Sequence, residues 1–226
     1  MFGRRNRTHF RLTPSCRDEV GKGRDRVAAC VRAGHMPLMA KLILVRHAPP
    51  QIEPDVAPPR WVLSAEGRRR CAWLAGELAA LGVARLYSSL EPKALETAAL
   101  TAVRLGLEVG PRRDLHENDR AGLAFGPLDV LKARIRRFFD EPSNLVMGQE
   151  TAEAALRRFE TAVRALAAET QDRTAAVVTH GTVLTLLVAR RNRVEPFAFW
   201  EALTAPSLVV LDPADFGLAD IRKYPD

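Results

Sequence analysis

The chain has 226 residues, of which 47% are hydrophobic and 27% are charged, a composition typical of globular proteins that excludes wholesale disorder. Its formal net charge of +7 suggests a nucleic-acid partner until the charge is located along the chain. No apolar run approaches the ~18 residues that cross a bilayer, which excludes an integral membrane protein.

The basic excess lies at the N-terminus. Residues 1–40 hold nine Lys or Arg and three acidic residues, a charge of +6, and residues 41–226 hold the remaining 25 basic and 24 acidic residues, a charge of +1. The segment lacks the apolar core of about 7–15 residues that a signal peptide needs. We expect residues 1–38 to be a loosely ordered extension, with Met36 and Met39 as alternative starts; a basic arm that contacts RNA or a membrane is the alternative.

The body, residues 39–226, is nearly neutral, and we therefore expect neither a nucleic-acid nor a membrane partner for it. The three cysteines, Cys16, Cys30 and Cys71, have no CxxC spacing and cannot all pair. This pattern argues against a zinc site and against a secreted disulfide scaffold, and it favours a reducing compartment, the cytoplasm. The sequence does not predict an oligomeric state.

From residue 41 onward, the pattern predicts strands alternating with helices. Residues 41–45, Lys-Leu-Ile-Leu-Val, predict a strand buried on both faces. Ser64 predicts a helix N-cap, and Gly82 the end of that helix. Further strands are predicted at 83–88, 107–113, 174–179 and 207–211, and further helices at 91–105, 127–139, 150–169 and 182–190. This order predicts an α/β fold, a three-layer α/β/α sandwich around a mostly parallel central sheet.

Two histidines follow predicted strands directly. Arg46 and His47 end the first strand, and His180 follows the apolar run Ala-Ala-Val-Val-Thr at 175–179. Ligands of parallel sheets bind beyond the carboxyl ends of the strands. Both imidazoles are therefore expected at the same edge of one sheet.

These two segments carry a family resemblance. Leu-Ile-Leu-Val-Arg-His-Ala at 42–48 and Val-Val-Thr-His-Gly at 177–181 resemble the two histidine motifs of the histidine phosphatase superfamily, which has the phosphoglycerate-mutase-like fold. Four further segments resemble motifs of that family in the right order: Trp-Val-Leu-Ser-Ala-Glu-Gly at 61–67, Tyr-Ser-Ser-Leu-Glu-Pro-Lys-Ala-Leu-Glu-Thr-Ala at 87–98, Leu-His-Glu at 115–117 and Gly-Gln-Glu-Thr at 148–151.

The resemblance implies a role for each site residue. His47 is implied to be the nucleophile that accepts the phosphoryl group. Arg46, Lys93 and His180 are implied to bind the phosphate, His180 as a donor if it is protonated. Glu117 is implied to donate a proton to the leaving alcohol, which needs a carboxyl group still protonated near the working pH; burial or the charge of the phosphate would favour that.

The chain departs from the family pattern at two places. Ala48, Pro49 and Pro50 stand where the family has Gly and then a polar residue, so the usual substrate contacts there are in doubt. Lys93 replaces an arginine, which exchanges a two-pronged guanidinium for a point charge. Phe197, Phe199 and Trp200 are interpreted as core packing, with a wall of the substrate pocket as the alternative.

We expect a metal-independent phosphatase that needs no cofactor and hydrolyses a small phosphorylated metabolite through a phosphohistidine. The alternatives are a mutase-type phosphotransferase, a phosphatase of phosphohistidine in a partner protein, and a non-catalytic phosphate-binding scaffold. Glu117 and His180 are 63 positions apart, which leaves little room for the lid of a mutase. Substrate specificity is expected to come from residues 49–60, 118–150 and 195–206.

Overall fold

A computed structural model describes residues 40–123, 126–170 and 172–225, so the extension predicted for residues 1–38 lies outside the described residues. Its central sheet has six strands in the order β3-β2-β4-β1-β5-β6. Strands β3, β2, β4 and β1 are parallel, and β5 and β6 are antiparallel to their neighbours. The strands are β1 (Leu42–Arg46), β2 (Arg85–Ser89), β3 (Val109–Arg112), β4 (Ala175–Thr179), β5 (Ser207–Leu211) and β6 (Leu218–Lys223).

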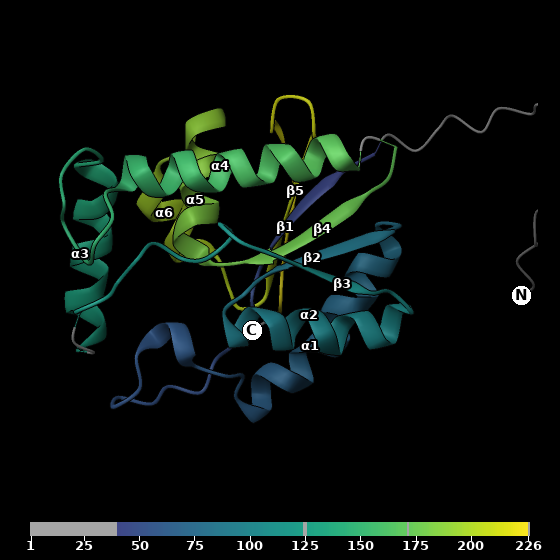
Figure 1. Ribbon diagram of the computed structural model, residues 1–226, viewed down its shortest axis with the longest axis horizontal. Helices are drawn as coiled ribbons and strands as arrows, with labels where there is room; N and C mark the ends of the chain where they lie inside the picture. Colours follow the sequence, from purple (N-terminus) through teal and green to yellow (C-terminus); the bar gives the residue numbers. More distant parts are fainter. Residues whose placement is uncertain (1–39, 124–125, 171, 226) are drawn as a thin grey trace, which may run out of the picture. The chain divides into compact units, whose positions relative to one another are not determined.

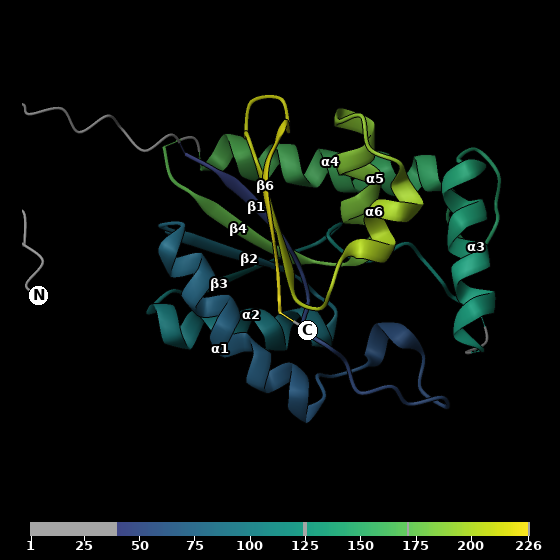
Figure 2. The same ribbon diagram turned by 180° about the vertical axis from the view of Figure 1, so that it is seen from behind.

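The described residues form six α-helices, of which α3 lies beyond the end of the sheet (Figures 1 and 2). They are α1 (Ala65–Ala80), α2 (Pro92–Leu105), α3 (Leu128–Asp140), α4 (Ala152–Glu169), α5 (Gly181–Arg191) and α6 (Pro196–Ala202), and a 3-10 turn spans Pro58–Arg60. Helices α1 and α2 lie on one face, and α4 and α5 lie on the other. Within the part of the chain that the structure describes, no helix is long and apolar enough to cross a membrane.

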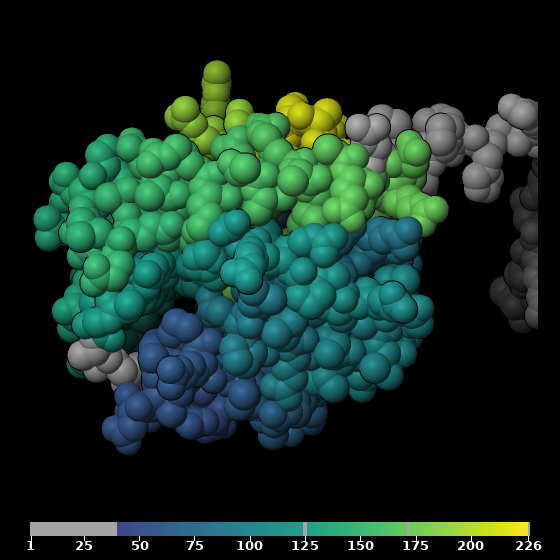
Figure 3. Space-filling model, in the orientation of Figure 1, coloured from purple at the N-terminus to yellow at the C-terminus, as the bar shows by residue number. Residues whose placement is uncertain are grey.

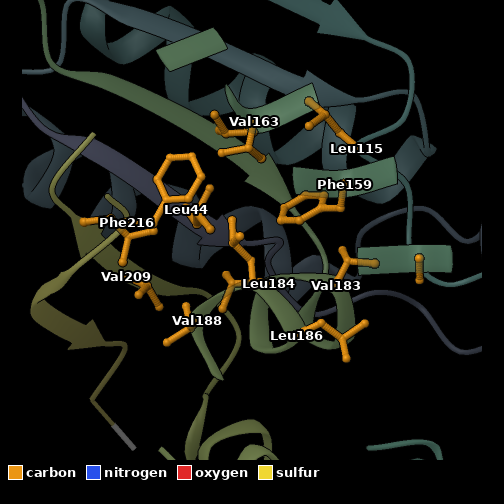
Figure 4. Packing of buried hydrophobic residues seen from close by; sticks show 14 of the residues in the cluster. Leu44, Leu115, Phe159, Val163, Val183, Leu184, Leu186, Val188, Val209 and Phe216 are labelled. Atoms are coloured by element: carbon orange, nitrogen blue, oxygen red, sulfur yellow. The ribbon is translucent and has the colours of Figure 1, made fainter. Parts of the chain in front are cut away.

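Successive side chains of each strand point to opposite faces of the sheet, and each face carries its own hydrophobic core. Leu42 and Leu44 of β1 point to the α4/α5 side, where Leu44 packs with Phe159 of α4 (Figure 4). Ile43 and Val45 point to the opposite side, against α1 and α2. Successive side chains of a strand face opposite sides of a sheet, so a continuous apolar run is what a doubly covered strand needs. The expected three-layer α/β/α architecture is confirmed.

The predicted strands and helices are all present, with their ends shifted by at most two residues. Three elements were not predicted: the 3-10 turn, α6 and β6. Strand β6 lies at the sheet edge, and its sequence Leu-Ala-Asp-Ile-Arg-Lys is largely exposed and has no apolar run. Helix α6 has only seven residues, and the Glu195 carboxylate caps it by accepting from the N–H groups of Phe197 and Ala198.

The start of α1 is fixed against the loop that follows His47. Ser64 caps the helix by accepting from the Gly67 N–H, and its own N–H and hydroxyl donate to the Pro49 carbonyl oxygen, each at 3.1 Å. A Cβ atom at Gly67 would lie 2.2 Å from that same oxygen. The motif at 61–67 therefore holds the segment beside His47 by direct backbone contact.

Replacing Gly67 by alanine is expected to destabilise the protein by about 1–3 kcal/mol, because the added methyl group must push the Pro49 backbone away. Gly76 lies in the same helix, and a Cβ atom added there would have nothing within 4 Å. Gly76→Ala should therefore stabilise the protein by about 0.5–1 kcal/mol. Urea unfolding of both variants measures the difference. Shifts of the same sign and size would show that the contact at Gly67 relaxes freely.

Candidate active site

The two histidines meet because their strands are neighbours. Strands β1 and β4 pair in parallel with Arg46 opposite Thr179, so the next residues, His47 and His180, leave the sheet side by side. The His47 N–H donates to the Thr179 carbonyl at 2.9 Å, and the two ring centroids are 5.2 Å apart. This confirms that both imidazoles lie at the carboxyl edge of the sheet.

The surroundings of His47 define which ring nitrogen carries its proton. Nδ1 lies 2.7 Å from the Ala48 carbonyl oxygen, which can only accept, so Nδ1 is the donor and Nε2 keeps its lone pair. Burial holds the pKa of His47 well below its ordinary value, and the neighbouring His180 and Lys93 act in the same direction. His47 is therefore a neutral imidazole with a nucleophilic Nε2.

His180 is held in the neutral form as well. Burial, followed by the charge of Lys93, lowers its pKa well below the ordinary value. Its Nε2 lies 2.9 Å from Ser89 Oγ, and its Nδ1 has no hydrogen-bond partner among the described residues. The protein's own groups thus do not supply a protonated His180, and that form depends on the arrival of a negative charge.

Lys93 lies in the first turn of α2, and its ammonium group is almost fully buried. It donates to the Pro58 carbonyl oxygen at 2.9 Å and forms a short ion pair with Glu91. Glu91 also accepts from the Glu117 N–H at 2.9 Å and lies 3.4 Å from His180 Nε2. One carboxylate thus connects three of the residues that the sequence singled out.

Glu117 lies in the loop after β3, and its carboxylate caps the N-terminus of α5. It accepts from the N–H groups of Thr182 and Val183, both at 3.1 Å, and Arg120 lies 3.5 Å away. Burial raises the pKa of Glu117, but Arg120, then His180 and the N–H donors outweigh burial and lower that pKa to about 2. Burial acts in the expected direction, but it does not by itself keep this carboxyl protonated, so of the two expected causes the charge of a bound phosphate is the one left to favour the protonated form.

All five predicted site residues line one pocket of about 270 Å³. Arg46 lies at its base, where its Nη1 donates to the Leu203 carbonyl at 2.6 Å. Most of the other lining residues come from the three segments expected to set specificity, namely Pro50, Ile52, Pro58, Pro59, Asn118, Arg120, Leu128, Leu131, Trp200 and Ala205, and Trp61 lies just outside the first of these segments. Figure 3 shows the surface hollowed between the blue segment near residues 50–62 and the green-teal α3.

Sequence reasoning missed two of the charged residues that shape this pocket. Glu91 was treated only as a helix start, although it stands two positions from Lys93 at the same strand end. Arg120 pairs with Glu117, and nothing in the sequence pattern pointed to it. Trp200 lines the pocket, whereas Phe197 beside it is buried in the core, so both interpretations of that aromatic cluster hold in part. His116 is not among the residues that line the pocket.

Lys93→Ala is expected to lower the rate of phosphoryl transfer by about 10²–10³, the cost of removing one group that stabilises developing charge. Lys93→Arg should keep much of the activity. Lys132 of α3, exposed and paired with Glu201, provides the control, and Lys132→Ala should leave the rate unchanged. Steady-state kinetics of the three variants test this, and an unaffected Lys93→Ala would show that its ammonium does not meet the phosphate.

Fold and pocket together define an α/β protein with two neutral histidines in a cationic pocket at the carboxyl edge of its sheet. The family model of the histidine phosphatase superfamily (branch 1) matches residues 42–220, and the chain belongs to this superfamily. Among the curated protein sequences, none matches the chain.

Several solved structures share the fold. A mycobacterial glucosyl-3-phosphoglycerate phosphatase has a TM-score of 0.67 and 18% identity, over 82% of this chain and 99% of that chain. Bacillus stearothermophilus YhfR has a TM-score of 0.64 and 22% identity, over 80% and 95%. A phosphoserine phosphatase from Entamoeba histolytica has a TM-score of 0.63 and 17% identity, over 81% and 97%. At these identities the likeness shows the fold.

Proposed function

We propose that this protein is a phosphatase that hydrolyses a small phosphorylated metabolite through a phosphohistidine at His47. The observation that carries the proposal is the geometry of His47, whose Nδ1 is bound to the Ala48 carbonyl and whose Nε2 keeps its lone pair inside a cationic pocket. Two further observations support it. The chain belongs to the histidine phosphatase superfamily, and the proteins that share its fold include phosphatases named for glucosyl-3-phosphoglycerate and for phosphoserine.

The proposed reaction has two steps. His47 Nε2 attacks phosphorus, a P–N bond forms, and the bond to the ester oxygen breaks as Glu117 gives that oxygen a proton. Water then attacks the phosphohistidine, its proton passes to Glu117, and inorganic phosphate leaves with the P–N bond broken. Arg46 and Lys93 hold the phosphoryl oxygens, and the charge of the phosphate raises the pKa of His180 so that it becomes a further donor.

The proton that Glu117 transfers must reach it with the substrate, because the protein's own groups set its pKa at about 2. Phosphomonoesters have a second pKa near 6. A substrate that binds as the monoanion brings one proton into the pocket, where the phosphoryl charge next to Glu117 raises the affinity of this carboxylate for it. We therefore propose that the monoanion is the productive form of the substrate.

A panel of phosphorylated metabolites, assayed for release of inorganic phosphate with and without a chelator, tests the proposal. We expect turnover that the chelator does not change, and a mutase would instead move the phosphoryl group without releasing it. Binding of phosphate without turnover of any member would favour a non-catalytic scaffold.

We place the protein in the cytoplasm on the cysteine pattern, and cell fractionation tests that location.

A further inference from the structure

The motif at 148–151 lies directly behind the loop that carries Glu117, outside the pocket. Gly148 has a φ of +71°, and a Cβ atom there would lie 1.8 Å from the Asp119 carbonyl oxygen. The Gln149 N–H donates to that oxygen at 2.9 Å. Only glycine permits this contact, and the motif therefore packs directly against the backbone that follows Glu117.

A partly buried ion pair extends this contact to the residues before Glu117. Arg158 of α4 binds both carboxylate oxygens of Glu150, at 2.9 and 2.8 Å, and the two side chains are only 15% and 14% exposed. The same guanidinium donates to the carbonyl oxygens of Asp114, His116 and Glu117, at 2.9, 3.1 and 3.2 Å. The pair thus holds the loop from behind without touching the Glu117 carboxylate.

Glu117 is consequently fixed from two directions. Its carboxylate is held by the N–H groups of Thr182 and Val183, and its backbone carbonyl by Arg158. A general acid has to lie within hydrogen-bond reach of the ester oxygen, and a displacement of about 1 Å can cost about 10²-fold in rate. Without the Arg158 guanidinium, the three backbone carbonyl oxygens and the Glu150 carboxylate would lose their hydrogen-bond donor, and the loop could move.

We propose that Arg158 and Glu150 are positioning residues for Glu117, and that this partly buried pair serves catalysis more than stability. The inference rests on the proposed function, since it assigns Glu117 the role of proton donor. A buried ion pair contributes little net stability against an apolar replacement. A polar pair with five hydrogen bonds, packed behind the proposed acid, fits a requirement for accurate placement.

The test compares two esters that differ in their need for an acid, ethyl phosphate and 4-nitrophenyl phosphate. Arg158→Gln is expected to lower kcat on ethyl phosphate by about 10–10² and to change kcat on the nitrophenyl ester by less than about threefold. Arg157 is its neighbour on α4 and is 72% exposed, so Arg157→Gln is the matched control and should change neither. Thermal unfolding confirms that the variants are folded. If Arg158→Gln does not fold, Glu150→Gln, which keeps one oxygen, replaces it with the same expected split.

The decisive measurement is made in the Glu117→Gln background. If Arg158 acts through Glu117, adding Arg158→Gln to Glu117→Gln should lower kcat on ethyl phosphate by less than about twofold, since the group that it positions is already lost. Equal losses on both esters, or losses that multiply in the double variant, would overturn the inference while leaving the phosphatase assignment intact. A wild-type protein that hydrolyses neither ester and no member of the metabolite panel would overturn the proposed function and this inference with it.

Discussion

His47→Ala is expected to abolish phosphatase turnover, with a loss of roughly 10⁴-fold or more, the scale seen when the nucleophile of a covalent mechanism is removed. The reason is geometric. In the proposed mechanism His47 Nε2 is the attacking atom, which the hydrogen bond from Nδ1 to Ala48 leaves available. Mass spectrometry of rapidly quenched wild-type protein should find an acid-labile phosphate on His47.

His116→Ala is the control for this variant, because His116 is half-buried and does not line the pocket. It should retain activity and carry the same phosphorylated His47. Unfolding midpoints of both variants separate loss of chemistry from loss of fold, since His47 is itself buried. Near-normal turnover by a folded His47→Ala, or phosphate found on another residue, would overturn the mechanism.

The sheet was predictable from sequence because each interior strand is covered on both faces. Such strands are continuous apolar runs, and the run at 41–45 shows this most clearly. Strand β6 was not predictable, because an edge strand with exposed Asp220 and Lys223 has no such run. The seven-residue α6 begins with Pro196 and is too short for an apolar period to emerge.

The positions of the two histidines were predictable from the sequence, whereas the ion pairs around them were not. Strand-end position and motif order led to His47 and His180. Pairing between Glu91 and Lys93, and between Arg120 and Glu117, depends on how separate loops meet, and local spacing does not encode it. The N–H groups of α5 that bind the Glu117 carboxylate likewise come from a segment 65 positions away.

Glu117→Gln should therefore distinguish substrates by their leaving groups. An alkyl phosphate needs its departing oxygen protonated, because an alkoxide is a poor leaving group, and we expect a loss of about 10²–10⁴ on ethyl phosphate. A nitrophenolate leaves readily without a proton, so the loss on 4-nitrophenyl phosphate should stay within about tenfold. Rates at saturating substrate measure both. The glutamine keeps one oxygen for the N–H groups of α5, and unfolding experiments confirm that the fold survives.

The pH dependence of kcat/KM tests the role of Glu117 independently of the comparison between the two esters. With a pKa near 2 for Glu117 in the protein's own surroundings, the transferable proton comes from the monoanionic ester, so wild-type kcat/KM on ethyl phosphate should fall as pH rises through about 6. In Glu117→Gln this decrease of kcat/KM at alkaline pH should disappear, because the glutamine cannot take up the substrate's proton and donate it to the leaving oxygen. Equal losses on both esters, with an unchanged decrease at alkaline pH, would mean that Glu117 orients the pocket and that another group donates the proton.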